Sequence, residues 1–175
     1  FARAADPSAF WVSIVEKALA KVAGSFEKLT RPLDPSNSLQ ALGMLSGGAP
    51  LQVNLPPAGG DADAAWNALQ TSWDTPHLKG VILDGSTEAL RNKTAEAAAR
   101  GIVANRPYCL LTSCTVAGIG RMVKLRGFYG EPEWNGKWSD RDPSWTNQLR
   151  SFLNYSDASD GSFFISFDDL CVNFS

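Results

Sequence analysis

Histidine and cysteine, which many metal sites and nucleophilic centres require, are scarce in this chain of 175 residues. The single histidine is His77, and the cysteines are Cys109, Cys114 and Cys171, with no Cys-x-x-Cys spacing. Structural zinc sites are built from clusters of Cys and His, so this composition argues against one. An odd number of cysteines without a disulfide-dense pattern indicates reduced, partly buried thiols in a cytoplasmic protein.

Long apolar runs are missing as well. No run approaches the roughly 18 residues that a membrane-spanning helix needs, and the N-terminus lacks the start of a secretory signal. We therefore expect no transmembrane segment. The net charge is −2, so the charge gives no case for nucleic acid or anionic membranes as main partners. Phe1 is not an initiator methionine, which indicates a processed chain or, as we favour, a piece of a longer one.

What is present suits a packed core, since apolar residues make up 44% of the chain, with six Trp and nine Phe. Apolar residues at helical spacing predict an amphipathic helix over Ser8–Ala23. Residues 30–60 are rich in Pro and Gly, which break long elements and leave room for short strands such as Pro50–Leu55. Asp61 is placed to cap a helix that runs to about Trp73.

The C-terminal half is rich in predicted strands. Gly80–Asp84 is a short apolar strand, and Gly101 is placed to end an Ala-rich helix. Arg106–Val116 and Arg121–Tyr129 flank a turn-type sequence and predict a β-hairpin. Ser162–Phe167 is a further strand. The sequence therefore predicts an α+β fold with an antiparallel sheet in its later half.

Three segments in this order resemble one family, the calpains, which are papain-like cysteine proteases. They are Phe10–Leu29, Val123–Asp140 and Asp160–Asp169, and the strongest signal is Glu133-Trp-Asn-Gly-Lys-Trp-Ser-Asp140. The resemblance covers residues 1–175 as the second catalytic subdomain and implies two packed antiparallel β-sheets flanked by helices. In this family the nucleophilic Cys sits in a preceding subdomain, which this chain does not contain. The chain is most similar to the catalytically degenerate calpain-like proteins of flagellated protists.

The resemblance places a catalytic His and Asn in this subdomain, and both positions are altered. Asn105-Arg106-Pro107-Tyr108 matches the family's Gly-His-Ala-Tyr, so Arg106 replaces the His, or Pro107 if the register slips by one. Arginine stays protonated near neutrality and cannot act as a general base. Gly127 matches the Asn and has no side chain to orient an imidazole. We therefore predict that this half is not catalytic.

Other residues do not replace the lost groups. His77 lies in a predicted loop far from the hairpin in sequence, and we interpret it as an ordinary surface or partly buried histidine. Cys109 and Cys114 lie on a predicted strand with no base nearby, so neither is expected to be a nucleophile.

Calcium binding is a separate expectation from the resemblance, which implies a site at Glu133, Asp140, Asp160 and Ser162. Three of these positions keep a carboxylate, and Ser162 offers only a hydroxyl. A calcium ion takes six to eight oxygens with several charges, so losing one carboxylate weakens the site. We favour acids that are solvated or cap turns over an occupied calcium site, and we expect no other cofactor.

The resemblance implies a non-catalytic module with a structural or scaffolding role, with cytoskeletal or flagellar-microtubule proteins as partners in the cytoplasm or axoneme. A calcium-dependent cysteine endopeptidase is the alternative, and a regulatory module that binds peptides without cutting them is a third. Trp134, Trp138 and Trp145 are a candidate stacking platform, although such aromatics more often pack a loop onto a sheet, which is the interpretation that we favour.

Overall fold

The computed structural model describes residues 8–29, 43–45, 47–49, 54–56, 60–71, 80–82, 95–104, 106–127 and 132–174. The helices are α1 (Trp11–Ala23), α2 (Phe26–Leu29), α4 (Ala62–Thr71), α6 (Asn147–Phe152) and α7 (Phe167–Phe174), with further helical stretches at 43–45 and 95–99. The strands are β1 (Gly80–Ile82), β2 (Pro107–Val116), β3 (Gly120–Gly127) and β4 (Ser162–Ser166). Among these residues no helix is both long enough and apolar enough to cross a membrane.

The strands form one antiparallel sheet of four strands in the order β1-β2-β3-β4. The β2–β3 hairpin is the predicted one, with Val116 opposite Gly120 at its turn. Gly118 has a φ of 76° in that turn, a conformation that glycine adopts without the clash of a Cβ. A bulge lies between Leu110 and Thr112, where the pairing register shifts.

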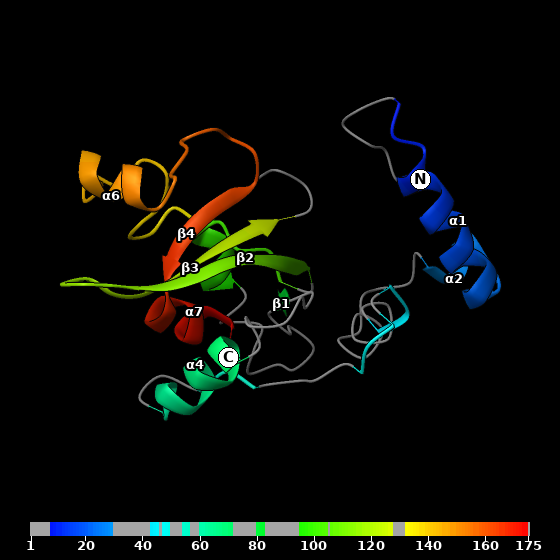
Figure 1. Ribbon diagram of the computed structural model, residues 1–175, viewed down its shortest axis with the longest axis horizontal. Helices are drawn as coiled ribbons and strands as arrows, with labels where there is room; N and C mark the ends of the chain where they lie inside the picture. Colours follow the sequence, from blue (N-terminus) through cyan, green and yellow to red (C-terminus); the bar gives the residue numbers. More distant parts are fainter. Residues whose placement is uncertain are drawn as a thin grey trace.

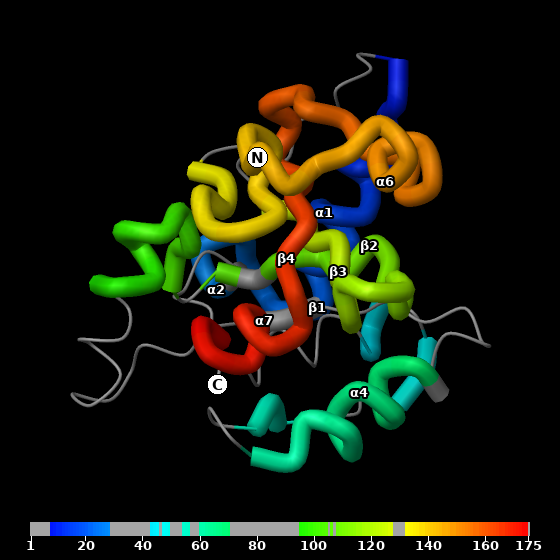
Figure 2. The backbone as a smooth tube through the Cα atoms, turned by 90° about the vertical axis from the view of Figure 1, so that its left-hand side faces the viewer, coloured from blue at the N-terminus to red at the C-terminus, as the bar shows by residue number. Residues whose placement is uncertain are grey.

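Helices and a loop cover the two faces of the sheet. In Figure 1, α4 and α7 lie on one side of the sheet and α6 on the other, and Figure 2 shows the same separation from a second direction. The first face buries a large core that includes Trp66, Leu125 and Phe167. The second face buries a smaller cluster that consists of Val116, Met122, Trp138, Trp145 and Phe164.

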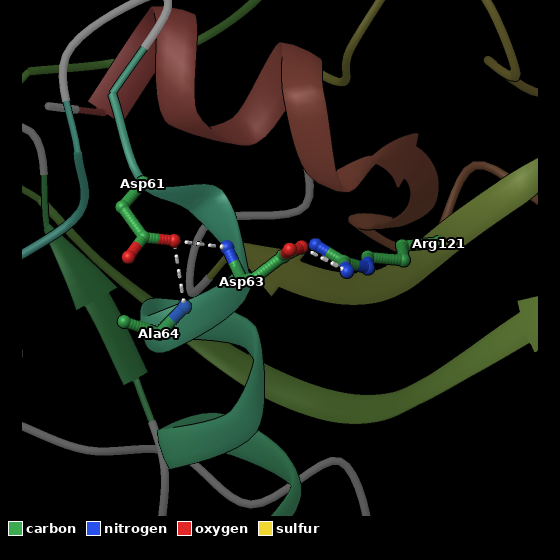
Figure 3. Close-up of polar contacts among 4 residues, drawn as sticks. All are labelled: Asp61, Asp63, Ala64 and Arg121. Carbon is green, nitrogen blue, oxygen red and sulfur yellow. Dashed lines mark hydrogen bonds and ion pairs between the residues drawn. The ribbon is translucent and has the colours of Figure 1, made fainter.

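Helix α4 is attached to the first face by polar and aromatic contacts, and Figure 3 shows the polar contacts at its start. Asp61 Oδ1 accepts hydrogen bonds from the backbone N–H groups of Asp63 (3.0 Å) and Ala64 (3.2 Å), which caps the helix as predicted. Asp63 pairs with Arg121 of β3. The guanidinium of Arg121 also lies 5.6 Å from the ring centroid of Trp66, so the start of α4 is held against β3.

Most of the predicted elements are confirmed, including the first helix, the capped helix, the hairpin and the α+β class. The described strands form one sheet, where the resemblance implied two packed sheets. The predicted strand Pro50–Leu55 falls largely outside the described residues, and residues 54–56 are not a strand. Helix α6 was not predicted from the sequence, although Thr146 caps it by accepting the N–H of Leu149.

The predicted apolar stripe of the first helix is not covered as expected. Trp11, Ile14 and Val22 are each more than 60% exposed, whereas Ala20 is buried. Figure 1 shows α1 and α2 apart from the sheet, and α1 packs mainly along α2. Helical periodicity therefore identified the helix correctly without showing what covers its apolar side.

Candidate functional site

The hairpin brings Arg106 and Gly127, the positions that the resemblance matches to a catalytic His and Asn, to the same end of the sheet. Arg106 is exposed and directly precedes β2, and Gly127 is the last residue of β3. The strand register pairs Gly127 with Tyr108, two residues after Arg106. A histidine at the first position and an asparagine at the second would thus be neighbours, as a papain-like site requires.

A buried tyrosine bounds the space beside Gly127. A Cβ added at Gly127 would lie 3.3 Å from Cε1 of Tyr108, and the Tyr108 ring packs edge-on against Phe163 and Phe174. The Tyr108 hydroxyl accepts a hydrogen bond from the N–H of Val103 at 2.8 Å. Burial raises the pKa of Tyr108, against a smaller opposing effect of that hydrogen bond. The phenol is therefore neutral at physiological pH and serves packing.

Within residues 106–110 and 125–127 of the described hairpin, no side chain can act as a base near neutrality. The titratable groups there are Arg106, Tyr108, Cys109 and Arg126. Two of these are guanidinium groups, which stay protonated. His77, the one histidine of the chain, lies outside the described residues.

The cysteines are free thiols. Cys109 pairs with Arg126 across the hairpin, and burial raises the pKa of Cys109 more than the charge of Arg126 lowers it. Burial likewise raises the pKa of Cys114. Burial, followed by the charge of Asp168, raises the pKa of Cys171 to about 11. A thiol with a raised pKa holds little thiolate at neutral pH, so none of these cysteines has the character of a nucleophile.

The three acids implied by the calcium expectation come together where the loop 132–143 meets the start of β4. Glu133 Oε1 accepts the N–H of Gly161 at 2.6 Å, and Asp160 Oδ1 accepts the N–H of Ser162 at 2.8 Å. Asp140 Oδ2 is buried and has no hydrogen-bond partner. A cavity of about 660 Å³ lies between the loop and residues 157–159.

Asp140 is the electrostatically strained acid of this group. Burial is the largest effect on its pKa, and the charges of Glu133, Asp160 and Asp157 add to it, which raises the pKa to about 6. The pKa of Asp142 in the same loop moves the other way. Burial acts to raise it, but hydrogen bonds from the N–H groups of Ser144 and Trp138 outweigh burial and lower it.

The described residues do not fit a ready-made calcium site. No group of three or more Asp, Glu, His or Cys side chains in this part of the chain is placed to hold a metal ion. Glu133 and Asp160 each direct one oxygen to a backbone N–H, and Asp140 Oδ2 is buried with no hydrogen-bond partner. A calcium ion takes six to eight oxygens with several charges, and the described side chains are not grouped to supply them.

The tryptophans in residues 134–145 pack inward and do not form a platform for ligands. Trp134, Trp138 and Trp145 are 4–6% exposed. The indole Nε1 of Trp134 donates to the carbonyl oxygen of Lys137 at 2.7 Å, and that of Trp145 donates to the carbonyl oxygen of Ser139 at 2.8 Å. This confirms the prediction that these aromatics pack the loop onto the sheet.

Comparison with known proteins identifies the class of this fold. The family described as calpain family cysteine protease matches residues 1–175. The chain is 32% identical over 176 residues to the calpain-type cysteine protease DEK1 of Arabidopsis thaliana, with 99% of this chain and 8% of that protein aligned. It is 30% identical over 183 residues to calpain-5 of Mus musculus, with 95% of this chain and 28% of that protein aligned.

The calpain-type cysteine protease ADL1 of Oryza sativa subsp. japonica is also similar, at 31% identity over 99% of this chain and 8% of that protein. The chain thus spans a small part of the relatives that it matches. The match extends over every residue, and on this basis the chain belongs to the calpain family.

Proposed function

We propose that this chain is a non-catalytic calpain-like module with a structural, scaffolding role in a protein assembly. The observation that carries the proposal is the pair of residues at the hairpin end. Arg106 directly precedes β2 and Gly127 ends β3 opposite Tyr108, and the resemblance assigns an imidazole and a carboxamide to these two positions.

The missing groups have distinct roles in papain-like hydrolysis. An imidazole takes the proton of the thiol and later protonates the leaving amine, and a carboxamide orients that imidazole. Guanidinium keeps its proton near neutral pH, and glycine offers no hydrogen-bond acceptor beyond its backbone. A residue outside 106–110 and 125–127 would thus have to carry out the proton transfer.

The proposal covers the whole of residues 1–175 as the second subdomain of a calpain core, with any nucleophile supplied by another part of a longer protein. As partners we propose cytoskeletal proteins, flagellar microtubules among them, in the cytoplasm or axoneme. Fold-level analogy alone supports this partner class. Co-sedimentation of the protein with microtubules tests it, and a protein that stays in the supernatant at all microtubule concentrations contradicts it.

A thiol-reactive peptide probe on the full-length protein that carries this chain tests the lack of catalysis. We expect no labelling with or without calcium. An Arg106→His/Gly127→Asn variant restores the missing groups, and an Arg106→Lys/Gly127→Ala variant is its matched control. Labelling of the unaltered protein that a cysteine-to-serine change in its nucleophile abolishes would contradict the proposal.

The second candidate is a calcium-dependent cysteine endopeptidase. The match to calpain family cysteine protease over the entire chain favours it, as do relatives whose names describe cysteine proteases. It requires that a base such as His77 reach the hairpin end. Probe labelling that a His77→Ala change removes would support this candidate.

A further inference from the structure

We propose that Asn135-Gly136 is a site of spontaneous deamidation, and that the reaction loosens the attachment of the loop 132–137 to the turn at residues 99–101. Asn135 is exposed and forms the one Asn-Gly pair of the sequence. Asparagine is a thermolabile residue, most of all before glycine, because no Cβ hinders attack by the next backbone nitrogen. The proposal concerns a chemical change in this loop and stands whether or not the full-length protein cleaves peptides.

The reaction needs only water besides the chain itself. The backbone nitrogen of Gly136 attacks the side-chain carbonyl carbon, Cγ, of Asn135, and the new N–Cγ bond closes a cyclic imide. The Cγ–Nδ2 bond breaks, and Nδ2 leaves as ammonia with the proton that the Gly136 nitrogen gives up. Water then opens the imide at either of its carbonyl carbons, which leaves aspartate or isoaspartate at position 135.

The Asn135 amide holds the loop against the turn. Its Nδ2 donates to the carbonyl oxygen of Ala99 at 2.9 Å, and the backbone N–H of Asn135 donates to the carbonyl oxygen of Arg100 at 3.0 Å. A carboxylate in place of the amide has no hydrogen to donate, and its negative charge repels the carbonyl oxygen that it faces. Deamidation therefore turns an attraction between the loop and the turn into a repulsion.

Packing requires glycine at position 136. A Cβ added there would lie 2.1 Å from Cζ2 of Trp134. The Trp134 side chain is 4% exposed and belongs to the larger core, and its Nε1 donates to the carbonyl oxygen of Lys137 at 2.7 Å. The indole is thus fixed and cannot move aside for a larger residue. The glycine that makes Asn135 labile is therefore demanded by the fold itself.

The folded state delays the reaction. The hydrogen bonds to Ala99 and Arg100 fix Asn135 in one geometry, whereas the attack requires Cγ to move onto the nitrogen of Gly136. Deamidation therefore proceeds from states in which the loop has opened locally. The product lacks the amide that closed the loop, so the change accumulates with time in one direction.

Incubation of the 175-residue chain in mildly basic buffer, both folded and unfolded in urea, tests the proposal by peptide mass spectrometry. We expect aspartate and isoaspartate to accumulate at position 135 in both samples, at least about tenfold more slowly in the folded chain. The melting temperature of the folded chain should fall as its deamidated fraction rises. The proposal is overturned by a chain that keeps Asn135 in both samples, by equal rates in the two, or by deamidation that leaves the melting temperature unchanged.

Asn135→Asp carries the carboxylate from the start and should melt at least about 2 °C below the unaltered chain. Asn154→Asp is the matched control. Asn154 is also exposed and lies just after a helix, α6, but in the described part of the chain only its backbone N–H donates, to the carbonyl oxygen of Ser151. The control adds the same charge and should lower the melting temperature much less. Equal losses in the two variants would count against the proposal.

Asn135→Ser has no amide to lose, so its melting temperature should stay constant during the same incubation. A drift as large as that of the unaltered chain would assign the change to another residue and overturn the proposal. If Asn135→Asp does not fold, the unaltered chain deamidated after folding replaces it in the comparison with Asn154→Asp. Probe labelling of the full-length protein plays no part in these measurements, so a failure here and a failure of the functional proposal are distinguishable.

Discussion

At the scale of single residues, Asp140 holds the most costly charge of the described loop. Its Oδ2 atom is buried without a hydrogen-bond partner, and its backbone carbonyl oxygen accepts the hydroxyl of Tyr155. The backbone contact fixes the position of the residue, while burial and the neighbouring acids disfavour its ionised side chain. The carboxylate is thus held in place by contacts that do not depend on its charge.

The pH dependence of the free energy of unfolding tests whether the charge of Asp140 is unfavourable in the fold. The pKa of Asp140 is raised from 3.8 to about 6 in the fold, so the folded state binds the proton more tightly than the unfolded state. Its contribution to stability is fully present below about pH 4 and is lost as the pH rises through about 6. In calcium-free buffer at neutral pH, Asp140→Asn should therefore raise the free energy of unfolding by about 1 kcal/mol, after a discount for solvent screening.

Asp142→Asn is the control for this prediction and has the opposite sign. Hydrogen bonds to its carboxylate outweigh burial and lower its pKa, and the N–H of Trp138 donates to it at 2.5 Å. The variant should destabilise the chain near neutral pH and lose this effect in acid. Equal effects of both changes in chemical denaturation would contradict the electrostatic assignment.

At the scale of elements, the loop 132–137 is joined to the end of the helical stretch 95–99. The N–H of Asn135 donates to the carbonyl oxygen of Arg100 at 3.0 Å, and its side-chain Nδ2 donates to that of Ala99 at 2.9 Å. Gly101, with a φ of 84°, lies so close that an added Cβ would be 1.9 Å from the carbonyl oxygen of Glu133. The loop thus approaches this turn more closely than any side chain allows.

Gly101→Ala should therefore destabilise the chain by at least about 3 kcal/mol, because a left-handed conformation and a backbone clash add together. Gly118→Ala is the matched control, since Gly118 has a φ of 76° and nothing within 4 Å of its added Cβ. Gly118→Ala should lower the free energy of unfolding by about 1 kcal/mol, from backbone strain alone. Equal losses in urea unfolding would show that the close approach to Glu133 does not matter.

The cap of α4 makes a second prediction at this scale. Asp61 accepts two backbone N–H groups at the start of the helix (Figure 3). Asp61→Ala should lower the free energy of unfolding by about 1 kcal/mol, and Asp61→Asn, which retains a capping oxygen, should lower it by much less. If both variants lower the free energy of unfolding by a similar amount, the stabilisation comes from the charge of Asp61 and not from its capping oxygen.

At the scale of the whole molecule, the thiols report on how the fold opens. Cys171 is 4% exposed and belongs to the larger core, whereas Cys109 and Cys114 are partly buried on β2. The pKa of Cys171 is raised from 9.0 to about 11, so its contribution to stability is present below about pH 9 and is lost as the pH rises through about 11.

Alkylation of the native chain by iodoacetamide at neutral pH should accordingly be slow at all three cysteines and slowest at Cys171. Its reaction requires opening of the core, while Cys109 and Cys114 react through local opening. Peptide mass analysis during partial labelling checks the order. Rapid labelling of one cysteine in the native state would reveal an activated thiol and contradict the assignment of inert thiols.

Local patterns accounted for much of the fold. Periodicity and turn residues predicted α1, α4 and the β2–β3 hairpin, because helix caps and turns depend on residues close together in the chain. The short helix α6 was missed, since its six residues carry too little periodic signal. The exposed stripe of α1 was also not foreseen, because periodicity does not reveal which partner an apolar face meets.

The chemical character of residues 106 and 127 follows from the sequence alone, because a guanidinium and a glycine offer the same groups in any fold. Tertiary structure decided that these residues lie at one end of a hairpin and that Asp140 carries a raised pKa. It also placed Lys124 and Arg126 of β3 opposite Phe164 and Ser162 of β4. Such effects depend on distances of a few ångströms between residues far apart in the chain, and these distances exist only after the strands have paired.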